Sequence, residues 1–285
     1  MRTPCAIAAC ALVGAAVALV LAGCDGRTRP AEPSPDGLLL KPMPPQGDDR
    51  QARLYQVRIV RLWHRLRPDA PAEDVWRLLG TTSVPHEKRA LWQANDLRLG
   101  EGGQMAAERL NELLAETADR TCQVSQLAVR ENFDFVVTLG ALRPALDIVW
   151  ADAGGRLGGC HFDEASARFR MVCRRSQTDP GVVCIAMAPE IAHGKQRMRY
   201  VRTEHGYTQR MMPDIVQVPD LEAEVSLPPG RILLIGGRRS SDVSVGGAFL
   251  FEQRGPDTWQ ETLIVTAQPV TGPPAPTGGR PPTTE

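Results

Sequence analysis

From Thr121 onward the sequence is divided into short runs of apolar and β-branched residues, and Gly, Pro, Asp or Asn separates most of them. Such runs with turn-forming residues between them are typical of strands in an antiparallel all-β module. Residues 121–268 are therefore predicted to form a β-rich domain, a mostly antiparallel sheet or sandwich. The predicted strands are 123–129, 133–139, 146–150, 168–174, 182–188, 197–201, 224–227, 231–235, 248–252 and 258–266.

Residues 51–120 mix the two kinds of periodicity. Apolar and polar residues alternate over 55–63, which predicts a strand with one buried face. The fold class predicted for the whole chain is α+β, with a small α/β N-terminal part preceding the β-rich domain, and a core shared by both parts is compatible with this pattern. Helices are predicted at 72–79, 86–94 and 104–119, and a short strand at 97–99.

The first residues have the pattern of an export signal. Arg2 precedes a long apolar run, and the small residues Ala22 and Gly23 close the segment. Leu21-Ala22-Gly23-Cys24 resembles the lipobox of bacterial lipoprotein precursors. This resemblance implies a signal peptide over 1–23, cleavage before Cys24 and lipid, such as palmitate, on that cysteine. A plain secretory signal or an uncut membrane anchor is the alternative, and every version places the rest of the chain outside the cytoplasm.

The lipobox resemblance implies a lipid-anchored protein on the extracytoplasmic side of a cell membrane. Two or more acyl chains hold a protein stably on a bilayer. Residues 24–50 are rich in proline and short polar residues, which predicts an extended tether in the cell envelope, or periplasm. Residues 269–285 have a similar composition and are predicted to be a disordered tail. Asp25 resembles the inner-membrane retention signal of enterobacterial lipoproteins, and the choice between inner and outer membrane stays open.

Charge and histidine spacing argue against several classes of function. The chain has 33 basic and 33 acidic residues, so no excess positive charge points to nucleic acid as a partner. The histidines have no spacing typical of zinc ligands, and there is no Cys-x-x-Cys, so neither a metal site nor a cofactor is predicted. The histidines are His64, His86, His161, His193 and His205.

The cysteines beyond Cys24 are Cys122, Cys160, Cys173 and Cys184. An even number of cysteines outside the cytoplasm suggests disulfides, with three possible connectivities. The favoured pair is Cys173 with Cys184, because a hairpin centred on the turn residues between them would place the two cysteines opposite each other. Four buried free thiols are the alternative.

Catalytic residues are not predicted. The sequence contains no Gly-x-Ser-x-Gly motif. An extracytoplasmic hydrolase could use Cys122 as its nucleophile, together with a distant histidine and Asn132, or an acid pair that no motif marks. A structural role is the favoured interpretation of Cys122.

Two predicted strands flank the turn Pro228-Pro229-Gly230 and end in the pair Gly236-Gly237. Pro229-Gly230 suits a type II turn, in which glycine supplies the positive φ. The glycine pair permits a sharp bend or a bulge.

With these motifs, residues 182–270 resemble the C-terminal β-domain of secretins, the ring-forming outer-membrane channels of secretion and pilus systems. In that domain a strand, a turn with glycine, an apolar strand and a Gly-Gly pair precede a polar loop, a Gly-Leu-Phe-type stretch and a final strand near a proline. The segments of this chain that follow the same order are 182–191, 224–237, 249–251 and 261–269.

These observations lead to one main functional hypothesis and two alternatives. The main hypothesis is a membrane-tethered envelope lipoprotein that is not an enzyme and that binds or scaffolds another envelope protein. The resemblance to secretins implies the first alternative, a ring-forming or secretin-associated component of a secretion or pilus system. The hydrolase is the second alternative.

Overall fold

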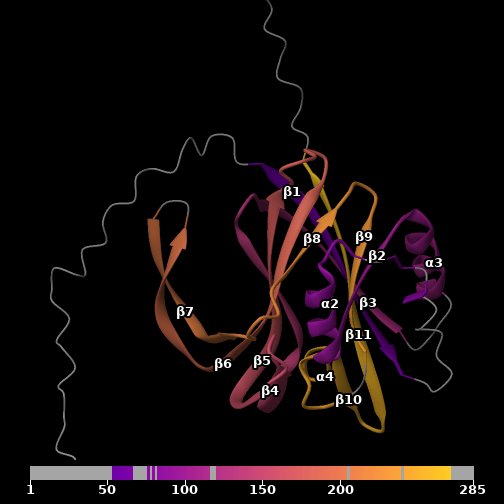
Figure 1. The fold of residues 1–285 in the computed structure, drawn as a ribbon. Helices are drawn as coiled ribbons and strands as arrows, with labels where there is room; N and C mark the ends of the chain where they lie inside the picture. Colours follow the sequence, from indigo (N-terminus) through magenta and orange to yellow (C-terminus); the bar gives the residue numbers. More distant parts are fainter. Residues whose placement is uncertain are drawn as a thin grey trace, which may run out of the picture. The chain divides into compact units, whose positions relative to one another are not determined.

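Two antiparallel sheets contain most of the residues that the computed structural model describes (Figure 1). Sheet A has the strand order β2-β9-β11-β1-β3, and β10 also pairs with β11. Sheet B has the order β4-β5-β6-β7, and β8 also pairs with β6. The predicted fold class is confirmed, since the chain is mostly β with few helices. The described residues are 53–66, 76–77, 79–80, 82–115, 120–203, 206–238 and 241–270.

Most predicted strands and helices are present, and most of the strands are longer than predicted. The strands of sheet A are β1 (Leu54–Arg65), β2 (Leu97–Gly102), β3 (Arg120–Arg130), β9 (Ile232–Gly237), β10 (Phe251–Arg254) and β11 (Asp257–Pro269). The strands of sheet B are β4 (Asp134–Ala151), β5 (Leu157–Arg175), β6 (Val183–Thr203), β7 (Gly206–Gln217) and β8 (Ala223–Leu227). The helices are α2 (His86–Ala94), α3 (Gln104–Ala115) and α4 (Val245–Leu250).

Strand β1 connects the two predicted parts of the chain. It pairs with β11 on one side and with β3 on the other, so that Ile59 lies opposite both Val265 and Ser125. The alternation predicted for this strand places Tyr55, Val57 and Ile59 in the core. The part before Thr121 therefore shares a sheet and a core with the β-rich part, and both belong to one compact unit, residues 50–285.

The main apolar core lies between the two sheets, and Phe169 of β5 is at its centre. Trp92 of α2 stacks on Phe169 with ring centroids 6.1 Å apart, and Phe249 of α4 meets it edge-on at 5.8 Å. A second, smaller core lies on the other face of sheet A, where α3 contributes the buried side chains of Ala106 and Leu110. Within the described part of the chain, no helix is long and apolar enough to cross a membrane.

Two strands of sheet B are longer than predicted because each continues through a bulge. The predicted strands 133–139 and 146–150 both belong to β4, whose register with β5 shifts near Gly140. The predicted strands 182–188 and 197–201 both belong to β6, whose register with β7 shifts near Gly194. A bulge bends a strand without ending it. In the sequence, a glycine at a bulge resembles a glycine in a turn.

The strand predicted at 248–252 is wrong in its first half. Residues 245–250 form helix α4, and Ser244 caps it by accepting a hydrogen bond from the N–H of Gly247 at 3.1 Å. A Cβ atom added to Gly247 would lie 1.4 Å from the carbonyl oxygen of Ser241, so only glycine permits this close approach. Strand β7 was not predicted, since its sequence contains Pro213 and lacks a clear apolar alternation.

The predictions for residues 1–23 and 24–50 lie outside the described residues. Of the tail predicted at 269–285, Pro269 belongs to β11 and residues 271–285 lie outside the described residues. The same is true of most of the helix predicted at 72–79 and of the last residues of the helix predicted at 104–119.

Candidate interaction surface

The predicted motif residues Pro229 and Gly230 form the turn between β8 and β9. Gly230 has a φ of +74°, as predicted for the glycine of a type II turn. The N–H of Arg231 donates a hydrogen bond to the carbonyl of Pro228 at 3.1 Å and closes the turn. The predicted lipid site, Cys24, lies outside the described residues.

Gly236 and Gly237 do not form the predicted bend or bulge, because both continue β9 in regular pairing with β2. Close packing explains why these positions are glycine. A Cβ atom on Gly236 would lie 2.6 Å from the ring of Trp76, and one on Gly237 would lie 2.1 Å from the ring of Phe251. The two glycines therefore serve side-chain packing rather than a change in strand direction.

Cys173 and Cys184 face opposite sides of sheet B, so the predicted disulfide is not formed. The register pairs Cys173 with Ile185 and Cys184 with Arg174, one residue away from the register that would place the cysteines opposite each other. Because successive residues of a strand point to opposite faces, Cys173 lies in the core and Cys184 lies near Ser226 on the other face. Both are free thiols. Burial raises the pKa of Cys173 to about 12.

The arrangement considered for a hydrolase is not assembled. Cys122 lies at the beginning of β3 and Asn132 lies just after its end. Ten residues of extended strand separate them by about 30 Å. The side chains needed for a Cys-His-Asn arrangement are therefore far apart.

The described residues contain no group of three His, Cys, Asp or Glu side chains placed to hold a metal ion. The exposed His161 lies between two carboxylates, with Nδ1 2.7 Å from Asp147 and Nε2 3.3 Å from Asp163. The hydrogen bond to Asp147 is the main cause that raises the pKa of His161. This cluster is an ion-pair network on the surface of β4 and β5.

The most exposed part of sheet B is the distal half of the β6–β7 hairpin. We call residues 197–203 and 206–212 the ribbon. They pair with each other from Arg197↔Met212 to Thr203↔Gly206. Strand β5 pairs with β6 only as far as Ala192, so the ribbon extends beyond the rest of the sheet as two strands. It stands apart from the other strands at the left of Figure 1.

One face of the ribbon carries large apolar and aromatic side chains that are exposed to solvent. The exposed fractions are 60% for Met198, 71% for Tyr200, 67% for Tyr207 and 53% for Met211. The pairs Met198↔Met211 and Tyr200↔Gln209 place these residues on one face. The sequence contains 3 tyrosines, and two of them lie here. This concentration of exposed apolar surface is typical of a protein interaction site.

The other face of the ribbon is basic. Arg199 lies directly opposite Arg210, and Arg197 lies on the same face. Like charges directly opposite each other destabilise a strand pair. The carboxylate of Asp214 forms an ion pair with Arg199 and lies 4.0 Å from Arg197. Of the three arginines on this face, the carboxylate of Asp214 thus pairs with two.

Sequence patterns alone did not identify the ribbon. The alternation over 197–201 predicted a strand, but alternation is the same whether the apolar face is buried or exposed. A signal was available in the basic residues on one face, since Arg197 and Arg199 alternate with Met198 and Tyr200.

The β4–β5 hairpin contains a comparable distal half, which we call the packed arm (residues 143–151 and 157–165). Its side chains Leu146, Ile148 and Phe162 belong to the main core. The backbone of the arm is held at its end by Asn95, which accepts a hydrogen bond from the N–H of Ala151 at 2.9 Å and donates one to its carbonyl at 3.0 Å.

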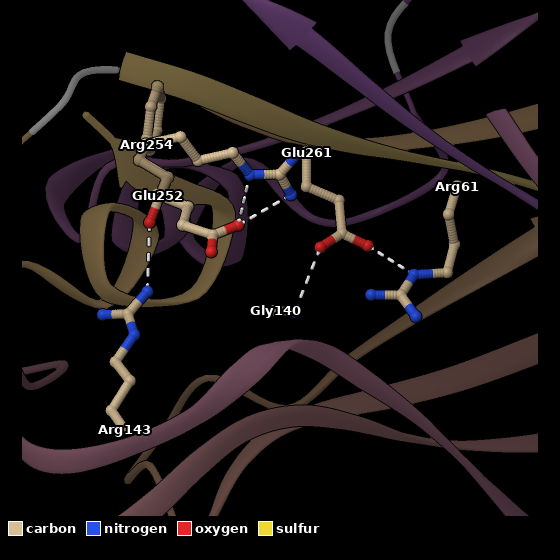
Figure 2. A network of polar contacts seen from close by, with 7 residues as sticks. Arg61, Gly140, Arg143, Glu252, Arg254 and Glu261 are labelled. Carbon is tan, nitrogen blue, oxygen red and sulfur yellow. Dashed lines mark hydrogen bonds and ion pairs between the residues drawn. The ribbon is translucent and has the colours of Figure 1, made fainter. Parts of the chain in front are cut away.

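A polar network holds the bulge of β4 against sheet A (Figure 2). Glu261 is 3% exposed, and its carboxylate accepts hydrogen bonds from Arg61 at 2.5 Å and from the N–H of Gly140 at 3.3 Å. Arg143 donates to the carbonyl of Phe251 at 3.0 Å. Burial lowers the pKa of the Arg143 guanidinium. These contacts tie the base of the packed arm to β10 and β11.

Comparison with protein-family models found no matching family, and comparison with curated proteins found no match. Among solved structures, the chain is similar to the secretin domain of InvG from the Salmonella SPI-1 injectisome, with a TM-score of 0.21, 9% identity, and coverage of 80% of this chain and 66% of that chain. For InvG in its open gate state the values are 0.21, 9%, 79% and 63%.

A third similar structure is the Klebsiella pneumoniae type II secretion system outer membrane complex of PulD, PulS and the PulC HR domain. Its TM-score is 0.20, its identity 9%, and the coverage 76% of this chain and 38% of that chain. The chain thus spans 66% or less of the length of these three proteins. This is a weak structural resemblance to secretin β-domains, and it carries no argument about function.

Proposed function

We propose that this protein is a binding or scaffolding module of the cell envelope, not an enzyme, held on a membrane by lipid on Cys24. In this proposal the ribbon binds another envelope protein. The observation that carries the proposal is the exposure of both faces of the ribbon beyond the end of β5. A two-stranded hairpin without further packing is marginally stable in water. A partner that covers the apolar face would stabilise it.

The chemistry of the two faces defines the partner. Tyrosine and methionine side chains suit an apolar groove, because both bury much apolar surface and methionine adapts its shape. The basic face favours carboxylates, since three arginines lie on it and the carboxylate of Asp214 forms ion pairs with two of them. The partner is therefore an envelope protein with an apolar groove bordered by acidic residues.

In-cell photo-crosslinking tests the role of the ribbon. A photoreactive amino acid at Gln209, on the apolar face, should form adducts with one envelope protein, whose identity mass spectrometry would establish. The same group at Leu157, which is 77% exposed at the tip of the packed arm, is the matched control. Substituting Tyr200 and Met211 by Ser should abolish the adducts while the melting temperature stays unchanged. Equal adducts from both positions, or none from Gln209, would contradict the proposal.

The lipid attachment has its own test. Cys24→Ser should abolish labelling with fatty acid and release the protein from the membrane fraction. Recovery of the unsubstituted protein from the cytosol, uncleaved and without lipid, would refute this part of the proposal.

A second candidate function is a ring of copies of this chain, as the resemblance to secretins implies. The supporting observation is that β4 and β7 lie at the two ends of the strand order of sheet B, although residues 243–244 bridge part of the outer edge of β4. An end strand presents unpaired backbone groups to which a further strand can add. Extraction in mild detergent followed by gel electrophoresis distinguishes the two candidates. Heat-resistant oligomers of high mass are expected for a ring, and a monomer for the scaffold.

A further inference from the structure

A cavity of about 180 Å³ lies between α2 and β2, far along the chain from the ribbon. Leu79, Trp92 and Leu99 form its apolar wall, and Thr82, Arg89 and Gln93 are its polar lining. Its volume equals that of roughly six water molecules in the liquid. The cavity can therefore hold one small organic molecule.

Two polar atoms of this lining have no hydrogen-bond partner among the described residues. Thr82 is 7% exposed, and its hydroxyl makes no hydrogen bond to the described residues. The buried Nε of Arg89 likewise has no acceptor in the described part of the chain. Buried polar groups are almost always hydrogen-bonded, and each exception calls for an explanation. Here two exceptions line the same cavity.

The neighbouring carboxylate does not satisfy the arginine. Glu101 pairs with Gly80 through a backbone bridge next to the cavity. Its Oε1 accepts hydrogen bonds from the backbone N–H of Ser83 at 2.6 Å and from the Ser83 hydroxyl at 3.1 Å. Among the described residues, no acidic side chain forms an ion pair with Arg89. Its positive charge therefore lines the cavity without a counter-ion from the residues that the structure describes.

We propose that this cavity binds the carboxylate group of a small organic acid. The guanidinium of Arg89 has the planar set of donors that matches a carboxylate, and the Thr82 hydroxyl offers one more donor. Trp92, Leu79 and Leu99 accept a short hydrocarbon body. A single arginine balances one negative charge, which favours a monocarboxylate over a phosphate dianion. This inference is independent of the ribbon and of the function proposed above.

Ligand-dependent melting of the full-length protein in detergent micelles tests the site. The probes are acetate, butyrate and benzoate, and butyramide serves as the uncharged analogue of butyrate, at constant ionic strength. An acid that binds should raise the melting temperature by about 2–4 °C at about five times its Kd. Butyramide should leave it unchanged. No shift with any of the acids, or equal shifts with butyrate and butyramide, would overturn the proposal.

Variants assign the binding to the cavity. Arg89→Gln should weaken the affinity for the acid, measured by titration calorimetry, at least about tenfold. Thr82→Val, which keeps the shape of the side chain, should weaken it less. Lys88→Gln is the control, since Lys88 donates to the carbonyl of Asp220 and does not line the cavity. If Arg89→Gln does not fold, Thr82→Val decides the test, and unchanged affinity in that variant would reject the site.

Discussion

The packed arm and the ribbon have the same backbone architecture, but the packed arm is buried against other elements and the ribbon is exposed to solvent. Each is the distal half of a long hairpin in sheet B, and each begins at a bulge with a positive-φ glycine, Gly140 in β4 and Gly194 in β6. The packed arm buries Leu146 and Ile148 in the main core. The corresponding face of the ribbon leaves its large side chains exposed. One hairpin thus completes the core, and the other remains available for a partner.

This difference depends on which other elements of the fold contact each arm. Helix α4 packs against β4, and residues 243–244 pair with the edge of β4, where the N–H of Val149 donates to the carbonyl of Val243 at 2.6 Å. No described element covers the apolar face of the ribbon, whose large side chains are 53% to 71% exposed. The alternation of the sequence and the length of a hairpin are therefore insufficient to predict whether it is part of the core. The elements that pack against the hairpin determine this.

Disrupting helix α4, which packs against the packed arm, should have the largest effect on stability. In Gly247→Ala, the new Cβ would be placed 1.4 Å from the carbonyl oxygen of Ser241, so the backbone of α4 must move. We expect the free energy of unfolding to fall by about 3 kcal/mol or more. Urea denaturation measures this loss. Hydrogen exchange should show faster exchange in the packed arm, whereas exchange in the ribbon should hardly change. If Gly247→Ala is as stable as the wild type, α4 does not support the packed arm.

Acid should destabilise the core through His64. This residue is 8% exposed, and its burial, together with the charge of Arg120, lowers its pKa from 6.5 to about 4. Above pH 6.5 the ring is neutral in both folded and unfolded chains. As the pH falls from 6.5 towards 4, the unfolded chain binds a proton that the folded chain excludes, and the stability falls by about 3 kcal/mol.

The measurement is urea denaturation of the wild type and of His64→Gln at pH 7 and at pH 4.5. The variant should lose less stability between the two pH values. The same dependence in both proteins would show that His64 is not responsible. Crosslinks formed by the ribbon at pH 7 are not expected to depend on this substitution, because His64 lies on β1.

Much of the fold was predictable because alternation and helical spacing are local. The strand over 55–63 and the helix over 86–94 were predicted from such patterns and are confirmed. The register of the β5–β6 hairpin was not predictable to one residue, and that single step places Cys173 and Cys184 on opposite faces. Bulges, helix α4 and strand β7 depend on contacts with distant segments, such as that between Gly247 and Ser241.

The candidate sites depend even more on contacts that are distant in the sequence. The cavity combines Thr82 and Arg89 with Leu99 across α2 and β2, and nothing in their spacing indicates that they share a space. The turn glycine Gly230 was predictable because a type II turn requires its positive φ locally. Turns and strands can be predicted from residues that are neighbours in the sequence. The surroundings of a side chain can be predicted only when the whole fold is known.

Removing one side-chain amide should cost an intermediate amount of stability in the packed arm and little in the ribbon. Asn95→Ala removes the hydrogen bonds to both backbone groups of Ala151. We expect a loss of about 2 kcal/mol, because these groups are left without partners. Gln209→Ala is the matched control, since its amide donates to Tyr200 at 2.6 Å on the exposed ribbon. That change should stay within about 0.5 kcal/mol. Denaturation curves that show equal losses would contradict the comparison.

The smallest expected effect comes from the two bulge glycines. Gly140 and Gly194 have φ values of +57° and +71°, and a Cβ atom on either would meet nothing within 4 Å. Alanine therefore brings only backbone strain, about 1 kcal/mol. The N–H of Gly140 is held by Glu261, so this bulge cannot relax and Gly140→Ala should show the full loss. The ribbon beyond Gly194 is free of β5 and can shift to relieve the strain. Gly194→Ala should therefore show less than half of that loss in urea denaturation, and equal losses would mean that the ribbon is held as rigidly as the packed arm.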